Sequence, residues 1–181
     1  GFDRVDVKAA RARNIVVTVT PNANHEAVAE QAIAQILAVA RGTIPMDRRV
    51  RAGAWRQAIL RPVRQTTLGI VGLGRIGRST AVKAEGLGMK IIAFESMPHM
   101  EFVRQHNIEL VDFDALLARS DYITIHCPLS DETRGMFNRQ TLAKMKPGSV
   151  LVNTARGGMI VEADLIEALK NGPLRAAALD V

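Results

Sequence analysis

The residues best suited to chemistry in this sequence begin with three closely spaced glycines. Gly72, Gly74 and Gly77 form a G-x-G-x-x-G pattern directly after the apolar run Leu68–Val71 and before a stretch with helical periodicity. In this context the first glycine permits a tight turn, the second lets the backbone approach a pyrophosphate, and the third lets the helix lie close to the sheet. The helix N-terminus then attracts the anion through its exposed amides and dipole. The pattern predicts a dinucleotide-binding loop, against the alternative of a glycine-rich turn without a ligand.

Two charged residues bear on which dinucleotide this loop would hold. Arg75 lies inside the loop and adds a positive charge. Glu95 ends the next apolar run, close to the ~20-residue spacing expected for the acid that accepts hydrogen bonds from the adenosine ribose. A carboxylate at this position repels a 2′-phosphate, so Glu95 favours NAD over NADP. The alternative is a solvated surface acid.

Further candidate residues stand where predicted strands end. The segment His126–Pro128 ends one strand, and the segment Thr154–Gly158 follows another. Ligands of open parallel sheets bind beyond the carboxyl ends of the strands. Arg156 is a fixed cation whose planar fork suits a carboxylate. Asp180 ends the last predicted strand and is expected to face the same crevice.

Cys127 is the only cysteine, which excludes an internal disulfide. Its ordinary interpretation is that of a small buried hydrophobic residue, set against its position at a strand end beside the predicted crevice. We predict no metal site in this sequence.

An alternation of strands and helices beginning at Thr66 must position these residues. Strands are predicted at Thr67–Val71, Lys90–Phe94, Glu109–Val111, Tyr122–Cys127, Ser149–Asn153 and Ala176–Leu179. Helices are predicted between them at Ile76–Gly86, Pro98–His106, Phe113–Ala118, Arg139–Met145 and Glu162–Lys170. The strands are short continuous apolar runs, as in a parallel sheet buried on both faces. The alternation predicts an α/β fold with a doubly wound parallel sheet of the Rossmann type.

The first 65 residues follow a different pattern. Their predicted elements are the strand Ile15–Val19, the helices Glu26–Arg41 and Pro45–Ala52, and the connector Gly53–Gln65. Pro21 closes the strand, Asn24 is a candidate cap for the first helix, and Gly42 ends that helix. This part of the chain is therefore expected to form an N-terminal helical arm.

The helix Glu26–Arg41 is apolar over more than half of its circumference. We expect one face to cover the sheet and the other to stay exposed in a monomer. Large exposed apolar patches usually mark an interface, so the arm predicts a homodimer. The alternative is that a second domain of the same chain covers this face.

The formal net charge of +6 is concentrated in arginines between Arg41 and Arg64. A basic patch is typical of contact with nucleic acid or an anionic membrane. The run lacks the interleaved aromatic residues of single-strand binders, so a solvated arm that pairs with acids is favoured, with no nucleic-acid or membrane partner. No apolar run approaches the ~20 residues of a membrane span, and we expect a cytoplasmic protein.

Longer stretches of the sequence resemble one enzyme family over essentially the whole chain. LGIVGLGRIGR, HCPLSDETRG, the segment from Leu151 to Val181 and the opening GFDRVDVKAARARNIVVTVTPNANHEAVAE are similar to the D-isomer-specific 2-hydroxyacid dehydrogenases. Within that family the resemblance is greatest to phosphoglycerate dehydrogenases and their 2-hydroxyacid relatives. It implies an NAD cofactor, a small 2-hydroxy or 2-oxo acid substrate, and a homodimer.

The resemblance also implies roles for individual residues. The cofactor-binding positions that it implies are Gly72, Gly74, Arg75, Ile76, Gly77, Glu95, His126, Cys127, Pro128, Thr133, Thr154, Ala155, Arg156 and Asp180. Arg156 would be the catalytic arginine that holds the substrate carboxylate and polarises the carbonyl. Asp180 would orient the nicotinamide carboxamide, and His126 would lie near the adenosine side. The family more often has Asp where this sequence has Glu95.

By the same resemblance, residues 1–20 would be the end of a substrate domain and its hinge, with the rest of that domain largely absent. Residues 21–181 would be the NAD-binding domain, with a dimerisation arm over 21–65 and a Rossmann core over 66–181. The family's arginine acts with a Glu and a His, and none of His25, His99, His106 and His126 matches that position.

We therefore expect the NAD-binding part of an oxidoreductase that is truncated at its C-terminus and inactive by itself. The alternative is a non-catalytic, NAD-sensing dimerisation module similar to a corepressor. The sequence leaves the particular 2-hydroxy acid open.

Overall fold

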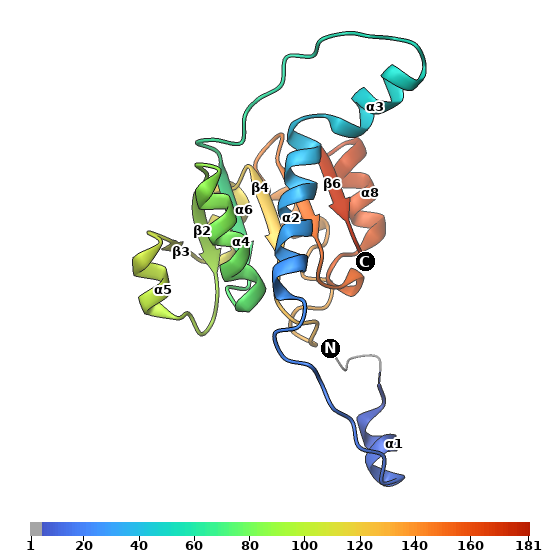
Figure 1. The fold of residues 1–181 in the computed structure, drawn as a ribbon, viewed down its shortest axis with the longest axis vertical. Coiled ribbons are helices and arrows are strands. Elements are labelled where there is room, and N and C mark those ends of the chain that lie inside the picture. The colour runs from blue at the N-terminus through green and yellow to red at the C-terminus, as the bar shows by residue number, and fades with distance from the viewer. Residues whose placement is uncertain (1–4) are drawn as a thin grey trace.

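The computed structural model describes residues 5–181, and its centre is a six-stranded parallel sheet with the order β3-β2-β1-β4-β5-β6 (Figure 1). The strands are β1 (Thr67–Val71), β2 (Lys90–Phe94), β3 (Glu109–Leu110), β4 (Tyr122–Ile125), β5 (Val150–Asn153) and β6 (Ala176–Leu179). The strands β1, β4 and β5 are buried almost throughout. The predicted doubly wound parallel sheet is confirmed, and strand order reverses direction between β1 and β4.

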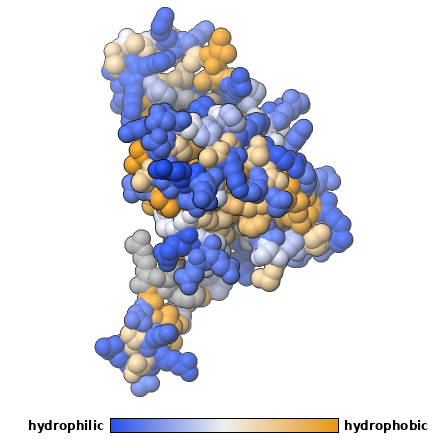
Figure 2. Space-filling model, turned by 180° about the vertical axis from the view of Figure 1, so that it is seen from behind, coloured by the Kyte–Doolittle hydropathy of each residue, from blue (hydrophilic) through white to orange (hydrophobic). Residues whose placement is uncertain are grey.

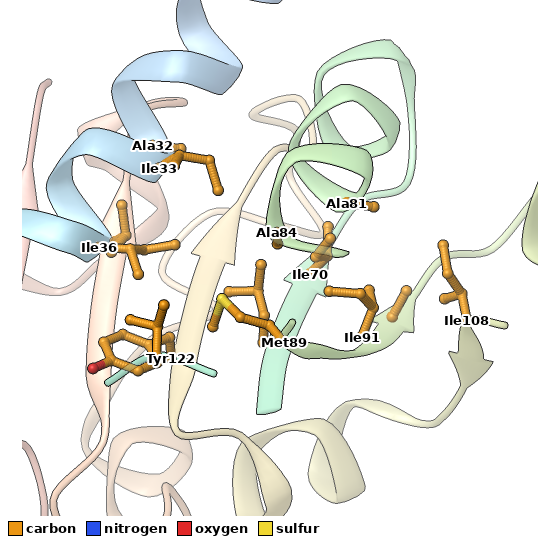
Figure 3. Packing of buried hydrophobic residues seen from close by; sticks show 14 of the residues in the cluster. Ala32, Ile33, Ile36, Ile70, Ala81, Ala84, Met89, Ile91, Ile108 and Tyr122 are labelled. Atoms are coloured by element: carbon orange, nitrogen blue, oxygen red, sulfur yellow. The ribbon is translucent and has the colours of Figure 1, made fainter. Parts of the chain in front are cut away.

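Helices cover both faces of this sheet. Those of the alternating part are α4 (Arg75–Gly86), α5 (Met100–Gln105), α6 (Phe113–Arg119), α7 (Arg139–Ala143), α8 (Glu162–Lys170) and the short 3₁₀ turn η1 (Gly157–Met159). One core cluster joins α4 to one face through residues such as Ile70 and Ala84, part of which Figure 3 shows. The other cluster joins α6, α7 and α8 to the opposite face through Leu116, Leu142 and Leu165.

Three helices precede β1, namely α1 (Val7–Ala12), α2 (His25–Ala40) and α3 (Thr43–Arg51). The sequence predicts α2 and α3 but not α1. The strand predicted at Ile15–Val19 is absent: this segment is exposed and has no regular structure. A strand needs a neighbour for its backbone hydrogen bonds, and no strand of the described residues pairs with this segment.

Helix α2 belongs to the core rather than to an exposed arm. It packs along α4 and also contacts β5 and β6, and in Figure 1 it lies across the sheet between α4 and β6. Ala29, Ala32 and Ile36 are fully buried, and Glu26 pairs with Lys83 of α4. The expectation that a large apolar face of this helix stays exposed is therefore wrong, because the small alanines let α2 sit close to α4 and the sheet.

The exposed apolar side chains of the arm lie further along the chain. Ile44, Val50, Trp55 and Ile59 are all more than half exposed. They belong to α3 and to the connector between α3 and β1, which stands away from the body as an open loop (Figure 1).

The burial of α2 leads to a test of stability. Replacing Ile36 with aspartate places an unpaired charge in a fully buried site, so Ile36→Asp should lower the free energy of unfolding by at least about 3 kcal/mol. Ala34 is exposed on the same helix, and Ala34→Asp should change it by less than about 0.5 kcal/mol. Urea unfolding followed by circular dichroism measures both, and equal effects would contradict the placement of α2.

Candidate functional site

The candidate site lies where β1 and β4 end side by side. Val71 of β1 and Ile125 of β4 are paired in register, so the glycine loop and the segment His126–Pro128 leave the sheet next to each other. Strand order reverses between these two strands, and such a switch point opens a crevice beyond the sheet. Two cavities occupy this crevice, and His126, Cys127 and Pro128 line both of them.

The glycine loop has the geometry that its sequence predicted. Gly72 has a φ of +94°, and a Cβ there would lie 2.6 Å from the backbone nitrogen of Cys127. A Cβ on Gly77 would lie 2.1 Å from the carbonyl oxygen of Gly72. Any larger residue would therefore push apart the loop, β4 and the helix that follows.

Gly74 differs, because a Cβ there would meet nothing within 4 Å. It is the N-cap residue of α4, and no side chain caps the amides at that end of the helix. Open space in front of uncapped helix amides fits a bound phosphate group. The loop therefore fits the pyrophosphate of a dinucleotide.

Glu95, just after β2, is tied to this loop. Its carboxylate accepts hydrogen bonds from the amide of Leu73, at 2.7 Å, and from the amide of Met97, at 3.0 Å. Partial burial disfavours the charge, but the Met97 and Leu73 amides and the Ser96 hydroxyl outweigh it, so the pKa of Glu95 lies below its usual value. Glu95 is thus an anion that the fold holds beside the glycine loop.

The cavity that contains Glu95, called here the Glu95 cavity, measures about 500 Å³. Its lining is Val71, Gly72, Gly74, Phe94, Glu95, Ser96, Phe113, His126, Cys127, Pro128, Ser130, Glu132, Thr133 and Met136. The rings of Phe94 and Phe113 pack with their centroids 5.5 Å apart. A flat apolar group could lie on this wall while Glu95 meets polar groups attached to it.

The second cavity, called here the Arg156 cavity, measures about 480 Å³. Its lining is Asn24, Val28, Ile76, His126, Cys127, Pro128, Leu129, Thr154, Ala155 and Arg156. The start of α4 and the turn after β5 thus face a common space. One guanidinium in a wall of mostly apolar and neutral groups suits a small carboxylate.

Asn153, the last residue of β5, holds the turn that carries Arg156. Its fully buried side chain accepts a hydrogen bond from the Ala155 amide and donates one to the Arg156 carbonyl, both at 2.9 Å. The Arg156 guanidinium also donates to the Ala155 carbonyl, at 2.6 Å. The buried hydroxyl of Thr154 has no hydrogen-bond partner among the described residues.

His126 is placed between strand and helix. Its Nε2 lies 3.2 Å from the hydroxyl of Thr80 and 3.0 Å from that of Thr124. Because the Thr80 hydroxyl already donates to the Ile76 carbonyl, its oxygen accepts a hydrogen bond from Nε2. Burial lowers the pKa of His126 to about 4. The ring is therefore neutral near pH 7 and is poorly suited to shuttling protons.

Most of the predicted site residues line these cavities, and three do not. Arg75 and Gly77 lie in the loop and helix start without lining either space. Asp180 is also outside both linings and accepts a hydrogen bond from Gln31 of α2 at 3.3 Å. The roles assigned to these residues in binding a dinucleotide stay predictions.

Several site residues were missed by sequence reasoning. Asn24 and Val28 reach the Arg156 cavity from the start of α2, and Phe113 reaches the Glu95 cavity from α6. Only the packing of these helices brings them there. Asn153 carried a usable signal, because a polar residue that ends a buried apolar strand needs hydrogen-bond partners.

Another hollow, of about 520 Å³, lies at the opposite edge of the sheet, near Thr66, Asp121 and Tyr122. These residues stand at the amino ends of β1 and β4, away from the glycine loop, so this hollow takes no part in the site.

In residues 5–181 no group of three metal-binding side chains is close enough to hold an ion. Nor does any helix in that range have the length and apolar character to span a membrane.

An open, doubly wound parallel sheet with this glycine loop at its switch point is a dinucleotide-binding domain. The family model for the NAD-binding domain of D-isomer-specific 2-hydroxyacid dehydrogenases matches residues 33–181. The chain therefore belongs to this family of NAD-dependent oxidoreductases and contains its NAD-binding domain, as the sequence analysis predicted.

Known proteins agree with this assignment. The chain is 43% identical over its whole length to D-3-phosphoglycerate dehydrogenase of Archaeoglobus fulgidus, of which it covers 35%. It is 41% identical to glyoxylate reductase of Thermococcus litoralis, of which it covers 57%. It superposes with a TM-score of 0.92 and 32% identity on D-lactate dehydrogenase of Aquifex aeolicus complexed with NAD and lactic acid, covering 55% of that chain. The chain thus spans between one third and three fifths of these relatives.

The buried histidine leads to a test by pH. The pKa of His126 is 6.5 in the unfolded chain and about 4 in the folded chain, so unfolding takes up a proton at any pH between these two values. The free energy of unfolding therefore falls as the pH falls through this range, by at most about 1.4 kcal/mol per pH unit. His126→Gln should flatten the pH dependence of urea unfolding between these values. In proton NMR of the unmodified protein, the His126 ring signal is identified by its absence from the spectrum of His126→Gln. This signal should not titrate above about pH 5. A His126 signal with a midpoint near 6.5 would contradict the burial.

Proposed function

We propose that this protein takes part in the NAD-dependent interconversion of a D-2-hydroxy acid and the matching 2-oxo acid. The observation that carries the proposal is that Ile76, at the start of α4, and Arg156 line one cavity. A dinucleotide whose pyrophosphate lies in front of Gly74 extends from the loop into that cavity, where Arg156 can hold an acid beside it. Proteins named for phosphoglycerate, glyoxylate and lactate are among the relatives, which supports a small 2-hydroxy acid substrate.

In this proposal the residues of the Arg156 cavity bind and orient the substrate. The bound nicotinamide supplies or accepts a hydride. Arg156 binds the substrate carboxylate through its planar fork and draws electron density from the adjacent carbonyl. Asn153 is a positioning residue, because its two hydrogen bonds set the backbone of the turn on which Arg156 stands.

We further propose that these 181 residues alone do not catalyse turnover. The reaction needs a group that exchanges the hydroxyl proton, most often a histidine. Among the described residues, His126 is the only histidine that lines either cavity, and its low pKa leaves it neutral and hydrogen-bonded to threonines. The proton-transfer group of the proposed enzyme would then come from elsewhere in a longer protein.

Binding without turnover tests this function. The 181-residue chain should bind NADH in calorimetry and should show no steady-state oxidation of NADH with glyoxylate or another 2-oxo acid. A Cβ at position 74 meets no protein atom within 4 Å, so Gly74→Val should leave the fold intact and weaken NADH binding by more than about ten-fold, or about 1.4 kcal/mol. Gly86→Val, also in open space but at the far end of α4, is the matched control.

Two results would count against the proposal. Equal NADH affinity of Gly74→Val and Gly86→Val would show that the dinucleotide does not use the glycine loop. Robust turnover by the 181-residue chain would show that it holds its own proton-transfer group.

We also propose that a boundary between two domains lies near residue 20, as the sequence predicts. Val5, Val7, Ile15, Val16 and Val19 are all more than 40% exposed, although apolar residues of this size are usually buried. Figure 2 shows hydrophobic atoms on this segment, which projects from the body of the molecule. A second domain that includes residues 1–20 would cover them, with the hinge between this segment and α2.

We also propose that the protein is a homodimer, formed through α3 and the connector rather than through α2. Val50 is 51% exposed, Trp55 82% and Ile59 104%. These residues belong to a segment whose backbone stands away from the body (Figure 1), where a second copy can cover their exposed side chains. A contact in which each copy covers the same segment of the other is self-complementary under two-fold symmetry.

Light scattering tests the dimer. The chain should have a dimer mass at micromolar concentration, and Trp55→Asp with Ile59→Asp should yield a monomer with unchanged circular dichroism, because both residues are exposed in the single chain. Val82→Asp, at a 45% exposed site on α4, is the control and should stay dimeric. A monomer mass for the unmodified chain would refute the proposal.

A further inference from the structure

We propose that Glu132 is a second determinant of cofactor selectivity, acting with Glu95 to exclude a dinucleotide that carries a 2′-phosphate. The two carboxylates come from distant parts of the sequence, one after β2 and the other after β4, and both line the Glu95 cavity. The inference rests on the proposed function in one respect: the adenosine end of the dinucleotide must lie in this cavity.

The turn that carries Glu132 is held in place by its neighbours. The Thr133 hydroxyl accepts a hydrogen bond from the Ser130 amide and donates one to the Pro128 carbonyl, both at 2.8 Å. Pro128 itself lines both cavities. The turn is therefore tied to the wall of the crevice, and exchanging the exposed Glu132 side chain leaves these hydrogen bonds in place.

The charge balance of the cavity gives Glu132 its effect. Its lining includes two carboxylates, Glu95 and Glu132, and no lysine or arginine. A 2′-phosphate would bring up to two negative charges into a space without a compensating cation, whereas the 2′-hydroxyl of NAD is neutral and can donate to a carboxylate. Removal of one acid alone then leaves the other to repel the phosphate.

The two acids differ in what else they do. Glu95 accepts the amide of Leu73 within the glycine loop, so its replacement disturbs the loop that both dinucleotides share. Glu132 lines the cavity and is an exposed residue, and the hydrogen bonds that hold its turn do not involve its side chain. Its replacement should therefore change the affinity for NADP while leaving that for NAD nearly constant.

The test compares Glu132→Gln with Asp131→Asn. Asp131 is an exposed acid on the same turn and does not line the cavity, so the two variants lose the same charge one residue apart. Dissociation constants for NAD and NADP are measured by calorimetry at low salt. In a solvated site, Glu132→Gln should lower the NADP-to-NAD ratio of Kd about three- to ten-fold. Asp131→Asn should lower it less than about two-fold, and NAD affinity should be nearly constant in both.

Two further measurements, one at high salt and one on a variant that lacks both acids, test the same inference. Because Glu132 is exposed, its effect on the ratio should fall below about two-fold in 0.5 M salt, whereas a steric effect would not change. Glu95→Gln combined with Glu132→Gln should lower the NADP-to-NAD ratio of Kd further than either single variant, whatever the loop disturbance costs both dinucleotides. An unchanged ratio in Glu132→Gln, or an equal change in Asp131→Asn, would overturn the inference while NAD binding stands. If the unmodified chain bound neither dinucleotide, the proposed function would fail and this inference with it.

Discussion

The structure depends on how closely the glycine loop approaches its neighbours. Gly72 lies against the backbone where β4 ends, and Gly77 lies against the carbonyl of Gly72. These contacts let α4 start directly at the carboxyl edge of the sheet, with its amides facing open space. They also place His126–Pro128 beside the loop, so that one crevice holds both cavities. A side chain at either glycine would separate β1, β4 and α4, and the anion site would be lost with them.

Charged and polar groups differ along the length of the crevice. The carboxylate of Glu95 stands at the end beyond β2, the uncapped amides of α4 stand in the middle, and the guanidinium of Arg156 stands beyond β5. An elongated molecule with neutral hydroxyls at one end, phosphates in the middle and an acid alongside its other end matches this order. Each group is set by backbone hydrogen bonds, as with Glu95 and the turn held by Asn153, so little ordering remains to be done when a ligand binds.

The helices before β1 show how composition can mislead. The sequence of α2 is apolar around most of its surface, which suggested an exposed arm, yet its alanines are small enough for α2 to pack against α4 and the sheet at once. The polar, arginine-rich α3 contributes nothing to the buried core. Ile44 and Val50 of α3 are exposed, as are Trp55 and Ile59 of the connector. The large exposed apolar side chains are therefore on the segment that looks least like a core helix.

The sequence by itself determined the parts of this protein that depend on local order along the chain. The bounds of β1, β2, β6 and α8 were predicted to the residue, because short apolar runs between turn residues specify buried strands and helical periodicity specifies α8. The glycine pattern and Glu95 were found in the same way, since each follows a strand directly. Only the tertiary structure decided what Ile15–Val19 does, because a strand exists only beside a partner. It alone brought Phe113, Asn24 and Glu132 to the crevice, since residues far apart in sequence meet there only through the packing of helices and turns on the sheet.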